Sequence, residues 1–91
     1  MLIVVAYDVP DDRRRTRLAD ALEDFGVRVQ YSVFECLLTP EQLEALRKRV
    51  GAEIDTAEDT VRIYRLCAEC AAKVELLGTA KKTEDPEVYL V

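Results

Sequence analysis

The chain has 91 residues, of which 49% are hydrophobic, and its formal net charge is −5. A chain of this length forms one domain, which buries roughly 60–65% of the surface that the unfolded chain exposes. We therefore expect a single domain over residues 1–91. The sequence contains no histidine, which excludes the usual catalytic triads and most zinc sites. Any hydrolysis would then depend on carboxylates, with a bound metal ion.

The cysteine content and the lack of a signal-peptide pattern favour the cytoplasm as the compartment of this protein. Three cysteines, an odd number, do not form a disulfide framework, and they favour a reducing cytosol. The start lacks a basic signal-peptide region, and no apolar run approaches about 18 residues. We therefore expect a cytoplasmic protein that does not enter a membrane.

The acidic balance argues against general electrostatic binding to nucleic acid. The positive charges are nevertheless concentrated in the first half of the chain, where five arginines can form a local basic patch. These are Arg13, Arg14, Arg15, Arg17 and Arg28.

The first predicted element is a strand over residues 2–8. Apolar side chains occupy both alternating sets of positions, with Leu2 and Val4 on one face and Ile3 and Val5 on the other. This pattern predicts a strand that is buried on both faces. Asp8 follows at its carboxyl end, where a rigid element holds an acidic side chain still. Two interpretations of Asp8 remain open, a functional carboxylate and a cap for the next helix.

The next elements follow from capping signals and periodicity. Asp11 or Asp12 begins a helix that we expect to run to about Phe25, with Gly26 closing it. Residues 27–38 predict two strands, or one bent strand, that break near Gln30 and Ser32.

A second helix begins at Thr39-Pro40-Glu41-Gln42, which has the form of a capping box, and we expect Gly51 to end it. A strand over residues 60–66 follows, and then a turn or short helix over residues 67–72. We expect a further short strand over residues 74–77 and an apolar tail over residues 88–91.

This order, β-α-β-β-α-β, predicts a ferredoxin-like α+β fold with one or two extra C-terminal strands. Both helices of that fold cover the same face of the sheet. The first strand is apolar on both faces, so the second face needs a partner. We therefore expect a homodimer in which sheet faces sheet, with the tail, about residues 79–91, adding to the sheet of the partner subunit.

The cysteines present a separate motif. Cys67-Ala68-Glu69-Cys70 is a single CxxC, without a second pair to complete a zinc site in one chain. Three interpretations stay open: a structural turn, a metal site shared between two subunits, and a redox pair. Cys36 alternates with apolar neighbours and is expected in the core.

Three stretches together resemble the small CRISPR-associated Cas2 proteins. They are Tyr7-Asp8-Val9-Pro10-Asp11-Asp12, the arginine-rich run Arg13-Arg14-Arg15-Thr16-Arg17-Leu18, and the strand Gln30-Tyr31-Ser32-Val33-Phe34-Glu35. The resemblance covers almost the whole chain. It implies a ferredoxin-like homodimer, which in some members is a metal-dependent nuclease acting on single-stranded RNA or duplex DNA. It also implies a role in spacer acquisition, in which the dimer bridges two copies of the Cas1 integrase.

The resemblance also implies a site. Asp8 matches the family's first-strand aspartate, which faces its dimer mate and is held to bind magnesium, so Asp8 is the expected catalytic residue and metal ligand. Further positions match those that the family associates with the nuclease site, and we expect them to bind nucleic acid. These are Tyr7, Arg15, Arg17, Arg28 and Phe34.

Three functions remain as alternatives. The first is a Mg²⁺-dependent phosphodiesterase in which two Asp8 side chains meet across a dimer axis, since Mg²⁺ accepts one or two carboxylates plus water. The second is a structural adaptor without catalysis, whose arginines only clamp a nucleic-acid backbone and whose edges recruit the integrase. The third is a small regulatory domain that binds a metal or metabolite through Cys67 and Cys70.

Overall fold

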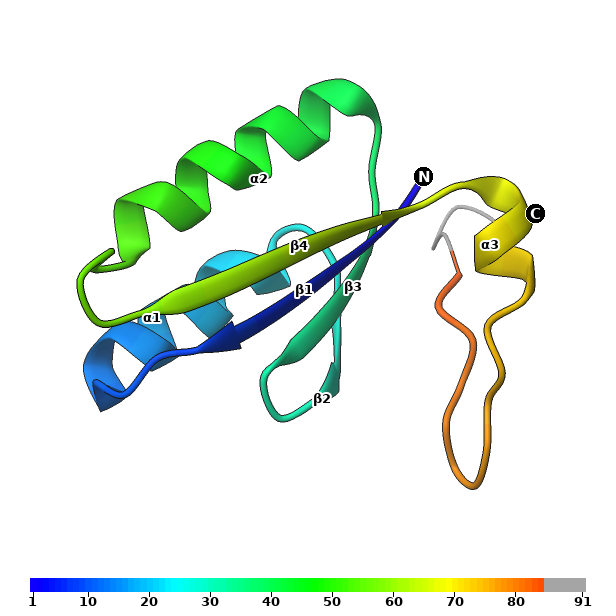
Figure 1. Ribbon diagram of the computed structural model, residues 1–91, viewed down its shortest axis with the longest axis horizontal. Coiled ribbons are helices and arrows are strands. Elements are labelled where there is room, and N and C mark those ends of the chain that lie inside the picture. Colours follow the sequence, from blue (N-terminus) through cyan, green and yellow to red (C-terminus); the bar gives the residue numbers. More distant parts are fainter. Residues whose placement is uncertain (85–91) are drawn as a thin grey trace.

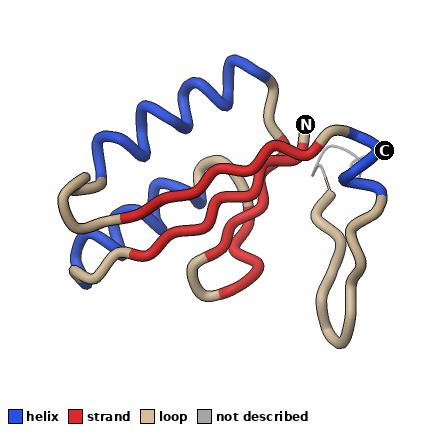
Figure 2. Tube along the Cα trace, viewed as in Figure 1, coloured by secondary structure: helices blue, strands red, loops and turns tan. Residues whose placement is uncertain are grey.

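The computed structural model describes residues 1–84 and contains the predicted order of elements (Figure 1). The elements are β1 (Leu2–Asp8), α1 (Asp12–Glu23), β2 (Val27–Gln30), β3 (Val33–Leu37), α2 (Pro40–Glu53), β4 (Thr60–Leu66) and α3 (Ala68–Ala72). The four strands form one antiparallel sheet in the order β2-β3-β1-β4 (Figure 2). The predicted ferredoxin-like α+β fold is confirmed, and so is the break between the two strands that follow α1.

Both long helices pack on one face of the sheet, and the core lies between them and that face. Ile3, Val5 and Tyr7 of β1 point into it, with exposed fractions of 0%, 0% and 6%. The helices and neighbouring strands contribute the rest, including Leu18, Ala19, Leu22, Phe34, Cys36, Leu43, Leu46 and Val50. Cys36 is thus a core residue, as the alternation predicted.

The other side of the sheet, which we call the open face, is not covered by α1 or α2. Directly opposed residues of antiparallel strands share a face. The register pairs Val4 with Glu35 of β3 and Tyr64 of β4, and it pairs Ala6 with Val33 and Arg62. The open face therefore carries mainly apolar side chains across β3, β1 and β4. They include Leu2, Val4, Ala6, Val33, Leu37, Tyr64 and Leu66.

The two helix starts follow their capping signals. Asp11 is the N-cap of α1, and its carboxylate accepts a hydrogen bond of 2.9 Å from the Arg14 amide. Thr39 and Gln42 form the predicted capping box of α2. The Thr39 amide donates to the Gln42 side-chain oxygen at 2.9 Å, and the Gln42 amide donates to the Thr39 hydroxyl oxygen at 3.2 Å.

The two glycines expected to end helices have other roles. Helix α2 continues through Gly51 to Glu53, because an exposed glycine costs a helix only about 1 kcal/mol relative to alanine and does not stop it. Gly26 does not take the left-handed conformation expected of a closing glycine, since Gly78 is the residue of positive φ among the described residues. A Cβ at Gly26 would lie 2.2 Å from the Glu35 carbonyl oxygen, so the position requires glycine for close packing on β3.

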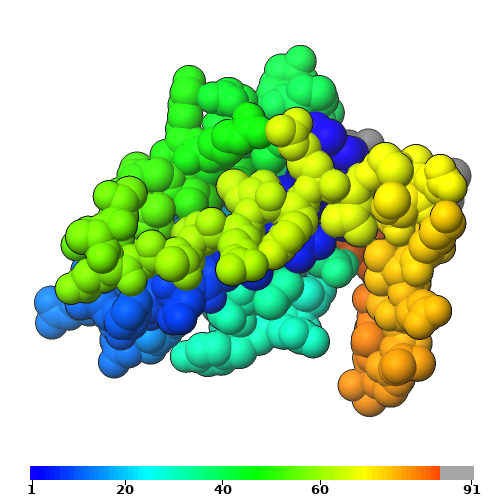
Figure 3. Space-filling model, in the orientation of Figure 1, coloured from blue at the N-terminus to red at the C-terminus, as the bar shows by residue number. Residues whose placement is uncertain are grey.

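The C-terminal part of the described chain departs from expectation. Helix α3 confirms the short helical link, but residues 74–77 form no strand, because within residues 1–84 no strand pairs with them. Segment 73–84 instead leaves α3 as an arm beside the sheet (Figures 1 and 3). A hollow of about 840 Å³ lies between the arm and β2, and the Thr83 hydroxyl donates to the Glu35 carboxylate at 2.5 Å. The predicted tail strand at residues 88–91 lies outside the described residues.

None of the helices within residues 1–84 combines the length and the apolar character that a membrane span requires.

Candidate functional site

Asp8 lies at the exposed end of β1, on the open face. It pairs through the backbone with Thr60 of β4, and its side chain follows Val4 and Ala6 along the same face. The capping role is filled by Asp11, so Asp8 is not the N-cap of α1. Within residues 1–84, the Asp8 carboxylate has no hydrogen-bond or ion-pair partner. It is therefore a rigidly held carboxylate that the fold itself does not use.

The Asp8 carboxylate can supply one of the two carboxylate ligands of a magnesium site. A carboxylate oxygen is the type of ligand that Mg²⁺ prefers, and Mg²⁺ usually keeps several waters beside one or two carboxylates. In the part of the chain that the structure describes, no three acidic, cysteine or histidine side chains gather into a metal-binding group. One chain thus offers one carboxylate, and a second copy facing the open face would supply another.

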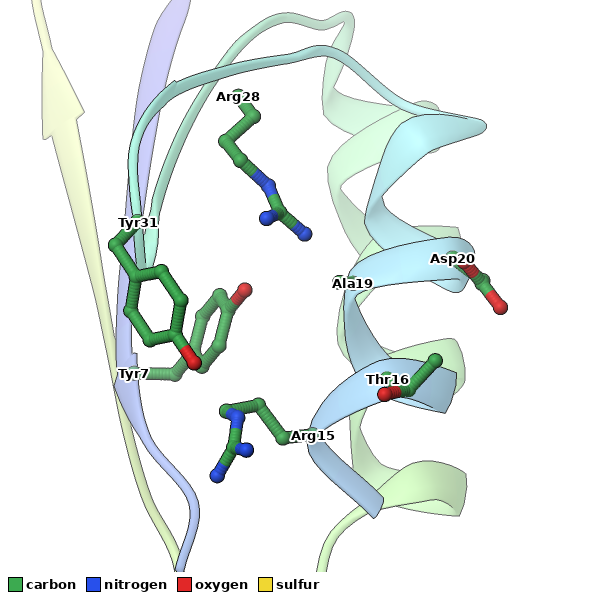
Figure 4. Close-up of a pocket in the computed structure, with 7 residues that line it drawn as sticks. All are labelled: Tyr7, Arg15, Thr16, Ala19, Asp20, Arg28 and Tyr31. Atoms are coloured by element: carbon green, nitrogen blue, oxygen red, sulfur yellow. The ribbon is translucent and has the colours of Figure 1, made fainter. Parts of the chain in front are cut away.

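A cavity of about 160 Å³ lies on the opposite side of the sheet, between β1, the turn after β2 and α1. We call it the arginine cavity. The guanidinium groups of Arg15 and Arg28 and the ring of Tyr7 face this space, and Tyr31 lies at its edge (Figure 4). Thr16, Ala19 and Asp20 of α1 complete the lining, and the Asp20 carboxylate points away from the two guanidinium groups (Figure 4). Two fixed positive charges beside aromatic rings suit a phosphate flanked by a base or sugar.

Aromatic packing beneath the cavity positions Arg28. Its guanidinium carbon lies 5.4 Å from the centroid of the Phe34 ring, within the range of a cation–π contact. The ring of Tyr7 stacks on Phe34 with centroids 6.4 Å apart and an interplanar angle of 29°. Phe34 is completely buried, so it cannot touch nucleic acid itself. The structure makes it the support for Tyr7 and Arg28, in place of the direct contact that the resemblance implied.

Arg15 is anchored at the turn between β1 and α1. Its Nη1 donates to the Val9 carbonyl oxygen at 3.0 Å, and its Nη2 forms an ion pair with Asp12. This anchoring holds the guanidinium toward Tyr7. Burial raises the pKa of the Tyr7 hydroxyl, and the nearby Arg28 charge opposes that rise only in part. Tyr7 is therefore a protonated hydrogen-bond donor at neutral pH.

The structure does not bring the whole predicted set together. Arg17 lies on another side of α1, where its Nε is 3.7 Å from a carboxylate oxygen of Glu53 in α2. Asp8 lies on the open face, whereas Tyr7, Arg15 and Arg28 meet in the arginine cavity on the helix face. One chain therefore presents two separate candidate surfaces.

Sequence reasoning missed two contributors. Arg14 donates from Nε and Nη2 to the two carboxylate oxygens of Asp59, at 2.9 and 3.1 Å, and from Nη2 to Glu58 at 2.9 Å. These bonds tie α1 to the loop before β4, whose first residue, Thr60, pairs with Asp8. Tyr31 lies in the predicted break, which is the turn between β2 and β3, and it lines the arginine cavity although it was not among the predicted site residues. No local sequence signal distinguishes Asp59 from the solvated acids around it.

Comparison with known proteins now decides the family. Residues 1–74 match the family model described as CRISPR associated protein Cas2. The chain belongs to the CRISPR-associated Cas2 family. It is 43% identical to the CRISPR-associated endoribonuclease Cas2 3 of Synechocystis, over 99% of this chain and 98% of the relative.

Solved structures agree with this assignment. The fold superposes on the crystal structure of Streptococcus pyogenes Cas2 at pH 6.5 with a TM-score of 0.75, at 36% identity, over 86% of this chain and 100% of that one. It also matches a chain of a partial Cas6-RT-Cas1–Cas2 complex with a TM-score of 0.70, at 29% identity, over 84% of this chain and 89% of that one. The resemblance stated from the sequence is confirmed, and this Cas2-family chain is assigned to CRISPR function.

Proposed function

We propose that this chain works as a homodimer in CRISPR spacer acquisition, where it binds nucleic acid and cleaves phosphodiester bonds with a divalent metal ion at Asp8. The observation that carries the proposal is the unpartnered Asp8 carboxylate at the rim of an uncovered apolar sheet face. The endoribonuclease name of the Synechocystis relative supports the reaction class.

The uncovered open face supports the proposed homodimer. Leu37 and Tyr64 on this face keep 37% and 47% of their surface exposed in the single chain. An apolar sheet face of this kind is most simply buried against a second copy of itself about a twofold axis. Asp8 continues the same row of side chains as Val4 and Ala6, so such packing brings it toward Asp8 of the partner subunit.

Asp8 and its counterpart would hold the metal ion. When bound there, Mg²⁺ lowers the pKa of a coordinated water and neutralises negative charge on a phosphate. The protein's own contribution is position: the ladder between β1 and β4 and the bonds from Arg14 to Asp59 fix the backbone around Asp8.

The arginine cavity would bind the nucleic-acid backbone away from Asp8. Arg15 and Arg28 present two guanidinium groups that suit phosphate oxygens, and the Tyr7 hydroxyl is a further donor. Arg17 adds positive charge on α1, where Glu53 partly neutralises it. Contacts of this kind position a backbone without reading its sequence.

A second candidate is a scaffold that bridges the Cas1 integrase and does not cleave. Two observations favour it: within residues 1–84 no further acidic side chain joins Asp8 in a metal-binding group, and the chain is similar to one chain of a Cas1–Cas2 complex. In that case Asp8 serves the dimer interface, and the arginine cavity holds the duplex.

Cleavage assays separate the two candidates. Single-stranded RNA and duplex DNA are incubated with the native protein and with Asp8→Asn, with and without Mg²⁺. Glu41→Gln serves as the control because it removes an exposed carboxylate on α2, away from both candidate surfaces. Metal-dependent cleavage that Asp8→Asn loses and Glu41→Gln keeps supports the nuclease. Cleavage that survives in Asp8→Asn contradicts the role of Asp8. No cleavage by any variant, with duplex binding retained in the presence of the integrase, establishes the scaffold.

A further inference from the structure

Two exposed thiols lie together at the junction between β4 and α3, and the proposed function uses neither. Cys67 directly follows β4 and caps the first turn of α3, and Cys70 lies one turn later. The Cys70 backbone amide donates to Cys67 Sγ at 3.5 Å. Side chains three residues apart on a helical turn have Cβ atoms about 5–6 Å apart, so a small tightening brings their sulfurs to bonding distance.

The two thiols are not equivalent. Hydrogen bonds from the amide and the thiol of Cys70 lower the pKa of Cys67, because they stabilise its thiolate. The same contact raises the pKa of Cys70, which keeps its proton longer. A thiolate beside a protonated thiol is the arrangement in which one sulfur attacks and the other resolves.

The surroundings make a resident metal ion a poorer explanation. Within residues 1–84, no third acidic or cysteine side chain joins the pair in a group that could hold a metal. Glu69, which lies between the cysteines, is paired with Lys73 at 3.2 Å. Burial in a core does not explain the pair either, because both thiols are exposed to solvent.

The third cysteine provides a contrast within the same chain. Cys36 is fully buried in the main core, and burial raises the pKa of its thiol to about 11. It is therefore unreactive in the folded protein. Any thiol chemistry of the native chain is confined to Cys67 and Cys70.

We propose that Cys67 and Cys70 are a redox-active dithiol that exchanges with low-molecular-weight disulfides. The Cys67 thiolate attacks one sulfur of the small disulfide, which breaks its S–S bond and releases one thiolate, and this thiolate takes a proton from solvent. Cys70 loses its proton to solvent and attacks Cys67 Sγ in the mixed disulfide, which releases the second thiolate. The two cysteines lose two electrons and two protons, and the small disulfide is reduced to two thiols.

The placement of the pair gives the reaction a structural effect. Helix α3 joins β4 to the arm of residues 73–84, which lies beside β2 and contacts Glu35 through Thr83. A bond between Cys67 and Cys70 tightens the turn from which this arm leaves. Oxidation therefore acts on the direction of the arm and leaves the sheet and the arginine cavity unchanged.

The test uses the full-length protein and oxidised glutathione as the probe. The reduced protein is incubated with a series of glutathione redox buffers, and its free thiols are alkylated and located by peptide mass spectrometry. We expect the free thiols of Cys67 and Cys70 to disappear together, because a disulfide forms between them, and we expect dithiothreitol to reduce this disulfide. Cys36→Ala is the matched control and is expected to give the same titration.

Single variants test the order of attack. In Cys70→Ser, Cys67 is expected to accumulate as a stable mixed disulfide with glutathione, whereas Cys67→Ser is expected to react several-fold more slowly. Circular dichroism confirms that both variants are folded. Equal rates in the two variants, or links only between chains, overturn the proposal. Stoichiometric zinc in the purified protein that blocks alkylation overturns it as well, because the thiols are then ligands.

Discussion

Tyr7 and Asp8 are adjacent in the sequence, yet their side chains lie on opposite faces of the sheet. Tyr7 is 6% exposed beneath the helices and lines the arginine cavity, whereas Asp8 is exposed on the open face. The pleat of β1 imposes this separation, because successive strand residues alternate between faces. Binding by the arginine cavity and chemistry at Asp8 are therefore separable by mutation, and the following predictions use that separation.

Replacement of Arg28 tests the arginine cavity. Arg28→Ala is expected to weaken binding of nucleic acid and to reduce the slope of log K against log salt by about 1, because one phosphate contact is lost. Arg47→Ala is the control, since Arg47 lies on α2 and pairs with Glu44 at 3.1 Å. Fluorescence anisotropy over a range of salt concentrations measures both. An unchanged slope in Arg28→Ala would remove this residue from the interface.

A charge on the open face tests the dimer. Tyr64 is 47% exposed in the single chain, and Tyr64→Asp is expected to convert a dimer into a folded monomer because it buries a charge in the apolar interface. Tyr31→Asp changes a tyrosine that is 71% exposed and lies away from the open face, and it is expected to leave the dimer intact. Light scattering after gel filtration distinguishes the two results. A monomeric native protein would refute the interface at once.

Two glycine substitutions are expected to act in opposite directions. Gly26→Ala places a Cβ 2.2 Å from the Glu35 carbonyl oxygen, and overpacking of this kind costs about 1–3 kcal/mol. Gly51→Ala meets no atom within 4 Å and lies inside α2, where alanine stabilises by about 0.5–1 kcal/mol. Urea unfolding of both variants measures the free energies. Similar effects would contradict the close approach of Gly26 to β3.

The Arg14–Asp59 pair predicts how stability depends on pH. Hydrogen bonds from Arg14 lower the pKa of the Asp59 carboxyl below the ordinary value of about 3.9. The contribution of the ionised Asp59 carboxylate to stability is therefore complete above about pH 5. This contribution is lost as the pH falls through about 4 toward the folded-state pKa. Asp59→Asn is expected to be less stable at pH 7 and to lose less stability on acidification, with exposed Asp20→Asn as the control. Thermal unfolding between pH 7 and pH 3 measures the slope, and parallel curves for Asp59→Asn and the native protein would contradict this account.

Periodicity and capping were sufficient to predict most of the fold. The apolar residues on both faces of β1 indicated a sheet with one uncovered face, and the capping box at Thr39 located the start of α2. The ends of helices were less predictable. Gly26 is required by the passing backbone of β3, which is a tertiary contact that no local pattern records. The expected strand at residues 74–77 failed for a related reason, since a strand needs a neighbour and none of the four strands in the described part of the chain pairs with this segment.

Three of the predicted site residues, Tyr7, Arg15 and Arg28, line the arginine cavity, but the arrangement of the whole set could not be predicted from the sequence. Alternation along β1 places Tyr7 and Asp8 on opposite faces, although the resemblance grouped them in one site. The partner of Arg17 could not be read from helix spacing, because Glu53 reaches it from α2. Phe34 was assigned to nucleic acid, whereas its position beneath Arg28 depends on the register between β2 and β3.

The position of β1 at the centre of the sheet has a consequence for synthesis on the ribosome. This strand emerges first, yet one of its two neighbours, β4, is the last strand of the sheet to be made. Until residues 60–66 have left the exit tunnel, one edge of an apolar strand has no partner. Pairings between distant parts of a chain form late, and unpaired apolar strands are prone to aggregate. Production of this protein is therefore expected to benefit from a chaperone that shields β1 until the sheet closes.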